Sequence, residues 1–287
     1  MHYVDAKGIL SAQNGMNLYR GCTHGCIYCD SRSKCYGFTH DFEDIEVKRN
    51  APELLRAALR SKRHRCMIGT GSMCDPYLHL EETEQLTRQC LEIIADEGFG
   101  VSILTKSTRI LRDLDLLIRI NEQAKSVVQM TLTTYDKELC RILEPNVSTT
   151  IERINVLNVL RDNGIPTVVW MTPILPFLND TEENVRGMLD ACIEAKVWGI
   201  LNFDMGLTLR EGNREYFYVA LEHHFPGLKE QYQQTFGNSY SCISPNAPKL
   251  RKLLLDTCAA HGIVSDIDEI LTYLQEFPIR ETQLTLF

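Results

Sequence analysis

The stretch that decides this chain reads Arg20-Gly21-Cys22-Thr23-His24-Gly25-Cys26-Ile27-Tyr28-Cys29-Asp30. Its cysteines have the spacing C-x3-C-x2-C, so three thiolates in one short loop can each bind one iron of a [4Fe–4S] cluster. Such clusters usually take four cysteines, and a loop that supplies three leaves one iron open to a substrate or cofactor. An open iron favours redox chemistry over simple electron storage. The sequence therefore predicts that Cys22, Cys26 and Cys29 are metal ligands.

Zinc and disulfide bonds are the alternative uses of these thiols. His24 lies inside the loop, so a Cys3His zinc site is one alternative. Structural zinc motifs usually come as two separated pairs, whereas these cysteines are bunched and no second pair follows. A disulfide framework fits poorly, because 11 cysteines are an odd number scattered through a chain of 287 residues. The spacing favours the cluster.

Composition limits the class of protein. A chain of 287 residues with 44% hydrophobic content can form one large domain with an extension. The net charge of −8 argues against coating nucleic acid non-specifically, but it leaves a local basic groove open. The basic run Lys62–Arg65 precedes a strand and is interpreted as a solvated helix end. We see no signal peptide and no apolar run of membrane-spanning length, so we expect a cytoplasmic protein with no membrane contact.

Short apolar segments alternate with amphipathic ones along the first two thirds of the chain. The apolar segments are β-branched and apolar on both faces, as parallel strands covered by helices should be. Counting a first strand near 15–19, the alternation predicts about six β/α units, and hence an α/β fold with a parallel sheet curved into a partial (β/α)6 barrel. The other predicted strands are 66–70, 100–105, 127–132, 166–171 and 199–203.

The β/α alternation stops near Thr208, and helical patterns follow it. We expect helices over about 215–224, 228–236, 248–261 and 266–277. The chain is therefore divided into a core over 14–205, a C-terminal helical extension over 206–280 and a flexible tail over 281–287. Between the strands, Thr181 is the predicted cap of one helix, and Asn163-Gly164 is the predicted stop of another.

Polar and glycine-rich segments follow several strands, at the end where parallel sheets bind ligands. Gly69 to Tyr77 ends the second strand, where glycines let a ligand approach the backbone. Lys106 follows the third strand, and Thr131 and Thr133 end the fourth with one residue between them. Pro173 follows the fifth strand in a stiff loop. Taken singly, each has a structural alternative as a tight turn, a solvated lysine or strand filler.

The cysteine spacing, with an aromatic residue before the third cysteine, resembles the radical S-adenosylmethionine enzymes. In that family the amino and carboxylate groups of the cofactor chelate the open iron, and an electron from the cluster cleaves the sulfonium. The resulting 5′-deoxyadenosyl radical abstracts a substrate hydrogen. Further motifs over residues 14–205 resemble the spore photoproduct lyase-like branch. They are Asp75-Pro76-Tyr77, Thr105–Asp113, Glu144-Pro145, Glu152-Arg153 and Pro173–Asp180.

The resemblance implies a cofactor site at the tops of the strands. Tyr28 would lie against the adenine, and Lys106 with Thr131 or Thr133 would reach the carboxylate and ribose. Asp75 or its neighbour Ser72 would accept hydrogen bonds from the amino group, and Pro173 would support the base.

The segment after the second strand also supplies the catalytic candidates, Cys74 and Tyr77. The lyase carries its hydrogen-donating cysteine where this chain has Ser72. Cys74 stands two residues further on and is a candidate donor, with a buried structural thiol as the alternative.

Two segments outside the core bear on partners. Arg210 and Arg214 are candidates to bind phosphate or carboxylate and Tyr216 or Tyr218 to stack a base, although pairing of the arginines with nearby glutamates is equally compatible. The chain ends Gln283-Leu284-Thr285-Leu286-Phe287, which resembles the peptides that dock on the DNA sliding clamp. In such a peptide Gln283, Leu284, Leu286 and Phe287 would make the contacts, and a tail packed on its own domain is the alternative.

These features together predict a radical S-adenosylmethionine enzyme that abstracts hydrogen from a nucleic-acid or nucleotide substrate, as a lyase or in DNA repair. A flavodoxin or ferredoxin would supply the electron. A peptide or small-metabolite substrate is an alternative, and so is a non-catalytic iron–sulfur redox sensor. The sequence does not specify the substrate, the returning hydrogen donor or the oligomeric state.

Overall fold

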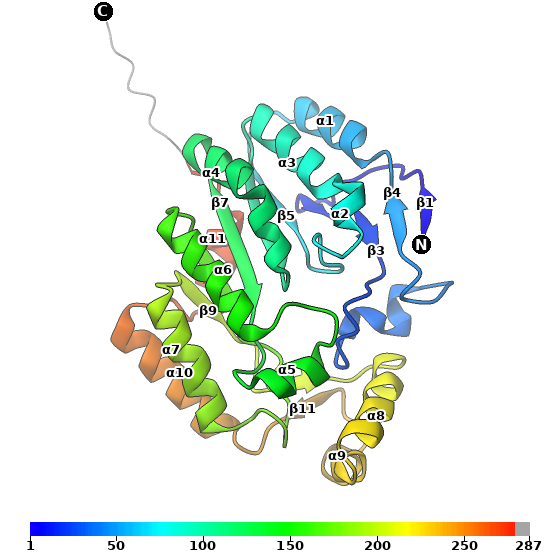
Figure 1. Ribbon diagram of the computed structural model, residues 1–287, viewed down its shortest axis with the longest axis vertical. Helices are drawn as coiled ribbons and strands as arrows, with labels where there is room; N and C mark the ends of the chain where they lie inside the picture. The colour runs from blue at the N-terminus through cyan, green and yellow to red at the C-terminus, as the bar shows by residue number, and fades with distance from the viewer. Residues whose placement is uncertain (279–287) are drawn as a thin grey trace, which may run out of the picture.

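The segments predicted as strands form one parallel sheet of six strands in the computed structural model, which describes residues 1–278 (Figure 1). The order β2-β5-β6-β7-β8-β9 follows the chain, so every crossover leads to the neighbouring strand and the sheet curves into a partial barrel. The predicted α/β fold with a partial (β/α)6 barrel is confirmed. The strands are β2 (Gly15–Met16), β5 (Met67–Thr70), β6 (Gly100–Thr105), β7 (Ser126–Thr131), β8 (Thr167–Trp170) and β9 (Gly199–Leu201).

The outer face of the sheet is covered by helices. Alternate strand side chains such as Ile103, Val128 and Val169 pack in the largest hydrophobic core. The hydroxyl of Thr181 accepts a hydrogen bond from the backbone N–H of Asn184, as expected of a helix cap. The helices of this region are α1 (Ala51–Ser61), α2 (Glu81–Glu84), α3 (Leu86–Asp96), α4 (Leu114–Gln123), α5 (Lys137–Leu143), α6 (Thr150–Asp162) and α7 (Glu182–Glu194).

The inner face of the barrel is closed at the amino-terminal ends of its strands by α11 (Ile267–Gln275). Ile270 and Leu274 pack there against inward-facing strand side chains. Above them lies a polar layer, in which the Trp170 indole donates to Gln129 at 2.7 Å and the Gln129 amide donates to Ser102 at 2.8 Å. The barrel is therefore filled below this layer and can hold a ligand only above it.

Residues 206–278 are mainly helical, with α8 (Asn213–His224), α9 (Leu228–Phe236) and α10 (Ala247–His261) preceding α11. The sequence analysis missed one feature: β10 (Gly206–Thr208) pairs antiparallel with β11 (Ser241–Ile243). Helix α10 packs against α7, and its Leu250 and Leu254 enter the barrel's own core. We therefore propose that this segment is an extension of the barrel rather than an independent domain.

A second small sheet, which the sequence analysis also missed, supports the cysteine loop. Its strands are β1 (His2–Val4), β4 (Glu46–Lys48) and β3 (Tyr19–Arg20), in that spatial order. Strand β3 ends two residues before Cys22, so this sheet directs the chain into the loop. Figure 1 places it at the edge of the barrel, beside α1 and α2.

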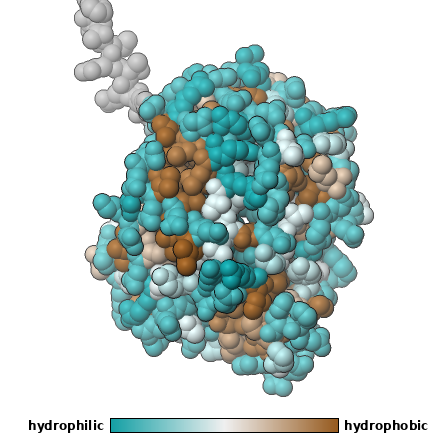
Figure 2. Space-filling model, viewed as in Figure 1, coloured by the Kyte–Doolittle hydropathy of each residue, from teal (hydrophilic) through white to brown (hydrophobic). Residues whose placement is uncertain are grey.

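Apolar side chains form separate patches among hydrophilic ones on the face shown in Figure 2. Within residues 1–278, no helix combines the length and hydropathy needed to cross a bilayer. The predicted tail over 281–287, with the proposed clamp contacts Gln283, Leu284, Leu286 and Phe287, lies outside the described residues.

Candidate functional site

A cavity of 390 Å³ opens at the carboxyl ends of the strands. Its wall combines the cysteine loop with the ends of β6, β7 and β8, with the segments that follow β5, β8 and β9, and with residues of β10 and β11. This volume falls within the range of about 300–1,000 Å³ that is typical of small-molecule sites. Among the predicted site residues, the cavity is lined by Cys22, Cys26, Tyr28, Cys29, Ser72, Cys74, Asp75, Lys106, Thr131 and Pro173.

The cysteine loop is held by backbone hydrogen bonds to distant segments. The N–H of Cys22 donates to the carbonyl of Phe42 at 3.0 Å, and the N–H of Ile27 donates to that of Leu143 at 3.0 Å. Gly21 precedes Cys22 with φ +92°, and a Cβ there would lie 2.4 Å from the Phe42 carbonyl oxygen. Only glycine therefore fits at the entry to the loop.

The three thiols do not form a zinc-sized group. Tetrahedral coordination with zinc–sulfur bonds of about 2.3 Å brings sulfur atoms to roughly 3.8 Å from one another. Across the described part of the chain, no set of three His, Cys, Asp or Glu ligand atoms within 4.8 Å of one another includes Cys22, Cys26 or Cys29. The arrangement therefore does not match a preformed tetrahedral zinc site with His24.

The thiols differ in how readily they ionise. Cys74, and further His24, lower the pKa of Cys22 against the opposing effect of burial. Burial raises the pKa of Cys26 and of Cys29. Because thiolates are the metal-binding form, the latter two must lose their protons to the solvent when metal binds.

Asp75 joins three segments at the cavity wall. Its carboxylate accepts from the Thr105 hydroxyl at 2.7 Å, from the Lys106 N–H at 2.8 Å and from the Tyr77 N–H at 2.9 Å. The Nδ1 atom of His24 lies 3.6 Å from Oδ2, the oxygen that also accepts from the Lys106 N–H. Asp75 thus lines the cavity as predicted, but much of its acceptor capacity is used within the chain.

The two predicted catalytic residues lie in different places. Cys74 lines the cavity, but it is buried beside Cys22, and its thiol donates to the carbonyl of Gly21 at 2.7 Å. This contact favours the structural alternative for Cys74. Tyr77 is fully buried outside the cavity, with its ring 5.8 Å from the Arg112 guanidinium. We infer that Tyr77 supports Asp75 and does not touch substrate.

Lys106 and Thr131 reach the cavity, whereas Thr133 does not line it. The Lys106 ammonium lies 5.9 Å from the centre of the Tyr28 ring. The side chains of Thr131 and Thr133 were expected to point to the same face because side chains alternate along a strand. Strand β7 ends at Thr131, so this alternation does not extend to Thr133. Thr133 is instead fully buried, and its carbonyl accepts from the Asn179 amide at 2.6 Å.

A buried ion pair beneath Tyr28 was not identified as functional from the sequence. The Tyr28 hydroxyl donates to Glu144, and Glu144 pairs with Arg153; the ion-pair side chains are both 0% exposed. Arg153 also donates to the carbonyls of Thr131 at 2.7 Å and Ser148 at 2.8 Å. Against the opposing effect of burial, Arg153 holds the pKa of Glu144 below its ordinary value. Both residues occur in motifs quoted above, but only the fold brings them together.

The predicted substrate contacts in the extension are engaged elsewhere. Arg214 donates to the carbonyls of Leu209 and Ser239, and the Tyr216 ring lies 3.7 Å from the Arg32 guanidinium. Tyr218 is buried. Arg210 donates to the Tyr240 hydroxyl at 2.9 Å and, like the other three predicted residues, does not line the cavity.

Exposed apolar side chains instead stand at the cavity wall. Phe203 and Ile243 line the cavity and are 50% and 37% exposed. The Phe203 ring packs edge-on against Trp170, with 5.5 Å between the ring centres. Large exposed apolar groups at a cavity are typical of a surface that is covered by a ligand.

Comparisons with known proteins place this architecture in a family. The model of the Radical SAM superfamily matches residues 16–190. An uncharacterised protein of Mycobacterium tuberculosis is 31% identical over 232 residues, covering 77% of this chain and 66% of the relative, so the chain spans just under two thirds of that protein. An uncharacterised protein of Methanocaldococcus jannaschii is 33% identical over 181 residues, with 62% and 67% covered. A Pseudomonas phage M6 protein named Radical SAM Nalpha-GlyT isomerase is 26% identical, with 59% and 34% covered.

Among solved structures, spore photoproduct lyase complexed with dinucleoside spore photoproduct matches with a TM-score of 0.61 at 14% identity, covering 86% of this chain and 74% of the lyase. This likeness concerns the fold. The superfamily uses a [4Fe–4S] cluster and S-adenosylmethionine, and the three-cysteine loop and the cavity above the filled barrel fit both groups. Because the family model covers more than half of the chain, including the cysteine loop, the chain belongs to the radical SAM superfamily.

Proposed function

We propose that this protein is a radical S-adenosylmethionine enzyme that abstracts hydrogen from a nucleic-acid or nucleotide substrate. The observation that carries the proposal is the shared cavity: the cluster cysteines, the cofactor candidates and the exposed apolar wall face one space. A redox sensor would need the cysteines but has no use for a cavity that joins them to several strand ends.

Each part of the cavity has a distinct task in this proposal. When bound, the reduced cluster and S-adenosylmethionine supply a 5′-deoxyadenosyl radical. Cys22, Cys26 and Cys29 hold the cluster, and Lys106 binds the cofactor carboxylate through its positive charge. Tyr28 lies against the adenine, in a position set by its hydrogen bond to Glu144.

The substrate class rests on the mouth of the cavity. Phe203 and Trp170 form an aromatic wall, and flat rings that are partly exposed can stack nucleobases without strict sequence preference. Spore photoproduct lyase, which shares the fold, has been solved with a dinucleoside lesion. The net charge of −8 argues against broad backbone binding, so we propose that a short nucleotide segment or an extruded base enters the cavity.

The test separates the reaction class from the substrate. Anaerobically reconstituted protein, reduced by flavodoxin or dithionite, should convert S-adenosylmethionine to 5′-deoxyadenosine. Cys26→Ala should abolish this conversion, whereas Cys66→Ala, which changes a cysteine remote from the cavity, should retain it. Equal turnover in the Cys26 variant would refute the proposed enzyme class.

Substrate candidates are then compared by deuterium transfer into 5′-deoxyadenosine. A deuterated thymidine-containing dinucleotide should transfer label, and Phe203→Ala should reduce that transfer more than it reduces uncoupled cofactor cleavage. Transfer only from a peptide or a small metabolite would overturn the nucleic-acid assignment and leave the enzyme class standing.

A further inference from the structure

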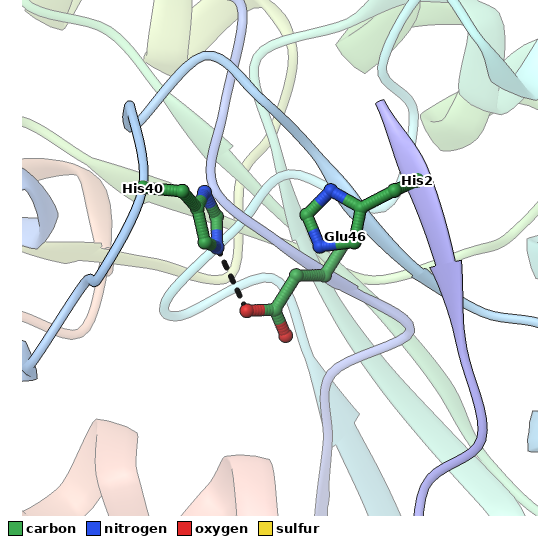
Figure 3. Close-up of side chains that lie close together, drawn as sticks. All are labelled: His2, His40 and Glu46. Carbon is green, nitrogen blue, oxygen red and sulfur yellow. Dashed lines mark hydrogen bonds and ion pairs between the residues drawn. The ribbon is translucent and has the colours of Figure 1, made fainter.

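A second cluster of metal-binding side chains lies in the small N-terminal sheet, outside the cavity. His2 on β1 is the register partner of Glu46 on β4, and His40 comes from the loop that precedes β4. One ligand atom from each of the three residues lies within 4.8 Å of the others, and Figure 3 shows the side chains close together. In the described residues this is the one group of three His, Cys, Asp or Glu that meets this limit.

Each histidine makes a hydrogen-bond contact through its Nδ1 atom. The Nδ1 of His2 lies 3.0 Å from a carboxylate oxygen of Asp44, and the Nδ1 of His40 lies 2.9 Å from the backbone carbonyl of Asp41. An oxygen acceptor at Nδ1 favours the tautomer that carries the proton there and leaves the Nε2 lone pair available. Histidines that bind metals almost always donate their other ring N–H to a carboxylate or a backbone carbonyl in this way.

The contact between His40 and Glu46 requires a positive charge. A carbonyl can only accept, so the Nδ1 of His40 carries a proton, and its Nε2 then lies 2.8 Å from the Glu46 carboxylate. A lone pair facing a carboxylate oxygen at this distance is repulsive unless a proton or a cation lies between them. A proton on Nε2 satisfies this contact as it stands. A metal ion would replace that proton, with the two ligand atoms somewhat further apart, and would also take His2.

Charges of both signs surround the three proposed ligands. Arg20 lies 3.3 Å from Oε1 of Glu46, the same oxygen that His40 contacts, and its guanidinium also donates to the carbonyls of Tyr36 and Gly37. Asp44 adds a further negative charge, which it shares between His2 and the terminal amino group of Met1. The contacts of Glu46 with Arg20 and with His40 both involve Oε1.

We propose that His2, His40 and Glu46 bind one Zn²⁺ ion. Two imidazole nitrogens and one carboxylate are a known zinc ligand set, with water in the fourth position. The ion would join β1 and the loop at His40 to β4, which pairs with β3 immediately before the cysteine loop. It would thus brace the segment that leads into Cys22. None of the three ligands lines the cavity, so this site is distinct from the cluster.

Zinc binding is tested on the cluster-reconstituted full chain without a polyhistidine tag, titrated with Zn²⁺ alone. Wild type should hold one zinc per chain after dialysis, in addition to its iron. His40→Gln should lower the zinc affinity at least about 100-fold with iron content unchanged. Asp44→Asn, which removes the charge that orients His2 and pairs with the Met1 amino group, should lower it about 10–100-fold. His64→Gln, at an exposed histidine elsewhere, is the matched control and should bind as wild type does.

Cobalt distinguishes this site from the cluster cysteines. Co²⁺ in the proposed site should give visible d–d bands without a thiolate-to-cobalt charge-transfer band, and the bands should disappear in His40→Gln. Absence of zinc in dialysed wild type, equal affinity in His40→Gln, or a spectrum with thiolate charge transfer would each overturn the proposal.

Discussion

Replacing Arg153 by methionine tests the buried support beneath Tyr28. The guanidinium is 0% exposed and forms an ion pair with Glu144, which is also 0% exposed. Methionine has a similar length and no charge, so the variant would leave the Glu144 carboxylate buried with the Tyr28 hydroxyl as a neutral donor. Two backbone carbonyls, of Thr131 and Ser148, would also lose a donor.

The expected cost follows from the uncompensated charge. Breaking a buried pair by removing one partner typically destabilises a protein by about 3–5 kcal/mol. At roughly 2 °C per kcal/mol for a chain of this size, the melting temperature should fall by about 6–10 °C. Replacing both partners, as Glu144→Leu with Arg153→Met, should restore most of the loss, because an apolar pair of similar volume carries no unpaired charge.

The assay is urea unfolding of the metal-free protein for wild type, both single variants and the double variant. A double-mutant cycle then isolates the coupling between Glu144 and Arg153. Arg161→Met, at an arginine paired with Asp162 on the surface, is the control and should cost at most about 1 kcal/mol. A cost below about 1 kcal/mol for Arg153→Met, or a double variant no more stable than the singles, would refute this account of the pair.

Three further predictions concern the loop, the cofactor site and pH. Gly21→Ala places a Cβ 2.4 Å from the Phe42 carbonyl oxygen and should lower iron incorporation severalfold, whereas Gly8→Ala, with nothing within 4 Å of its Cβ, should incorporate iron normally. Lys106→Met should raise the KM for S-adenosylmethionine about 10–100-fold with iron content unchanged, because a charge-assisted hydrogen bond contributes about 1.5–3 kcal/mol. An unchanged KM would argue against a contact between Lys106 and the cofactor carboxylate. Folding lowers the pKa of Glu144 from 4.5, so the stabilisation from its carboxylate is present above pH 4.5 and is lost as the pH falls through the folded pKa. The free energy of unfolding of wild type should therefore decrease with pH in this acid range, and that of Glu144→Gln should lack this decrease.

The sheet could be predicted because buried parallel strands are apolar on both faces. The predicted range 100–105 matches β6, and the other long strands agree within two residues at either end. The small sheets were missed because strands of two or three residues, such as β10, show no periodicity. The alternation argument also failed at Thr133, because period two holds only while the chain remains in a strand, and β7 ends at Thr131.

The site residues likewise separate into those that a local sequence pattern predicts and those that it does not. Cys22, Cys26 and Cys29 could be assigned because their spacing is local, and the cavity position of Lys106 followed from strand ends that meet at one edge of the sheet. The roles of Glu144 and Arg153 depend on burial by segments distant in sequence, which no local pattern reports.

What holds the cysteine loop is likewise non-local. Cys22 is bonded to the carbonyl of Phe42 and Ile27 to that of Leu143, while the Asn146 amide donates to the carbonyl of Thr23. These bonds connect the loop to a segment just before β4, to the end of α5 and to the chain that follows α5, and none of them involves a thiol. The fold therefore helps to set the shape of the loop through groups other than the metal ligands. A substitution at Asn146 or in the loop that contains Phe42 can therefore reduce cluster assembly even though Cys22, Cys26 and Cys29 are unchanged. For this reason a three-cysteine motif alone does not ensure a functional cluster site.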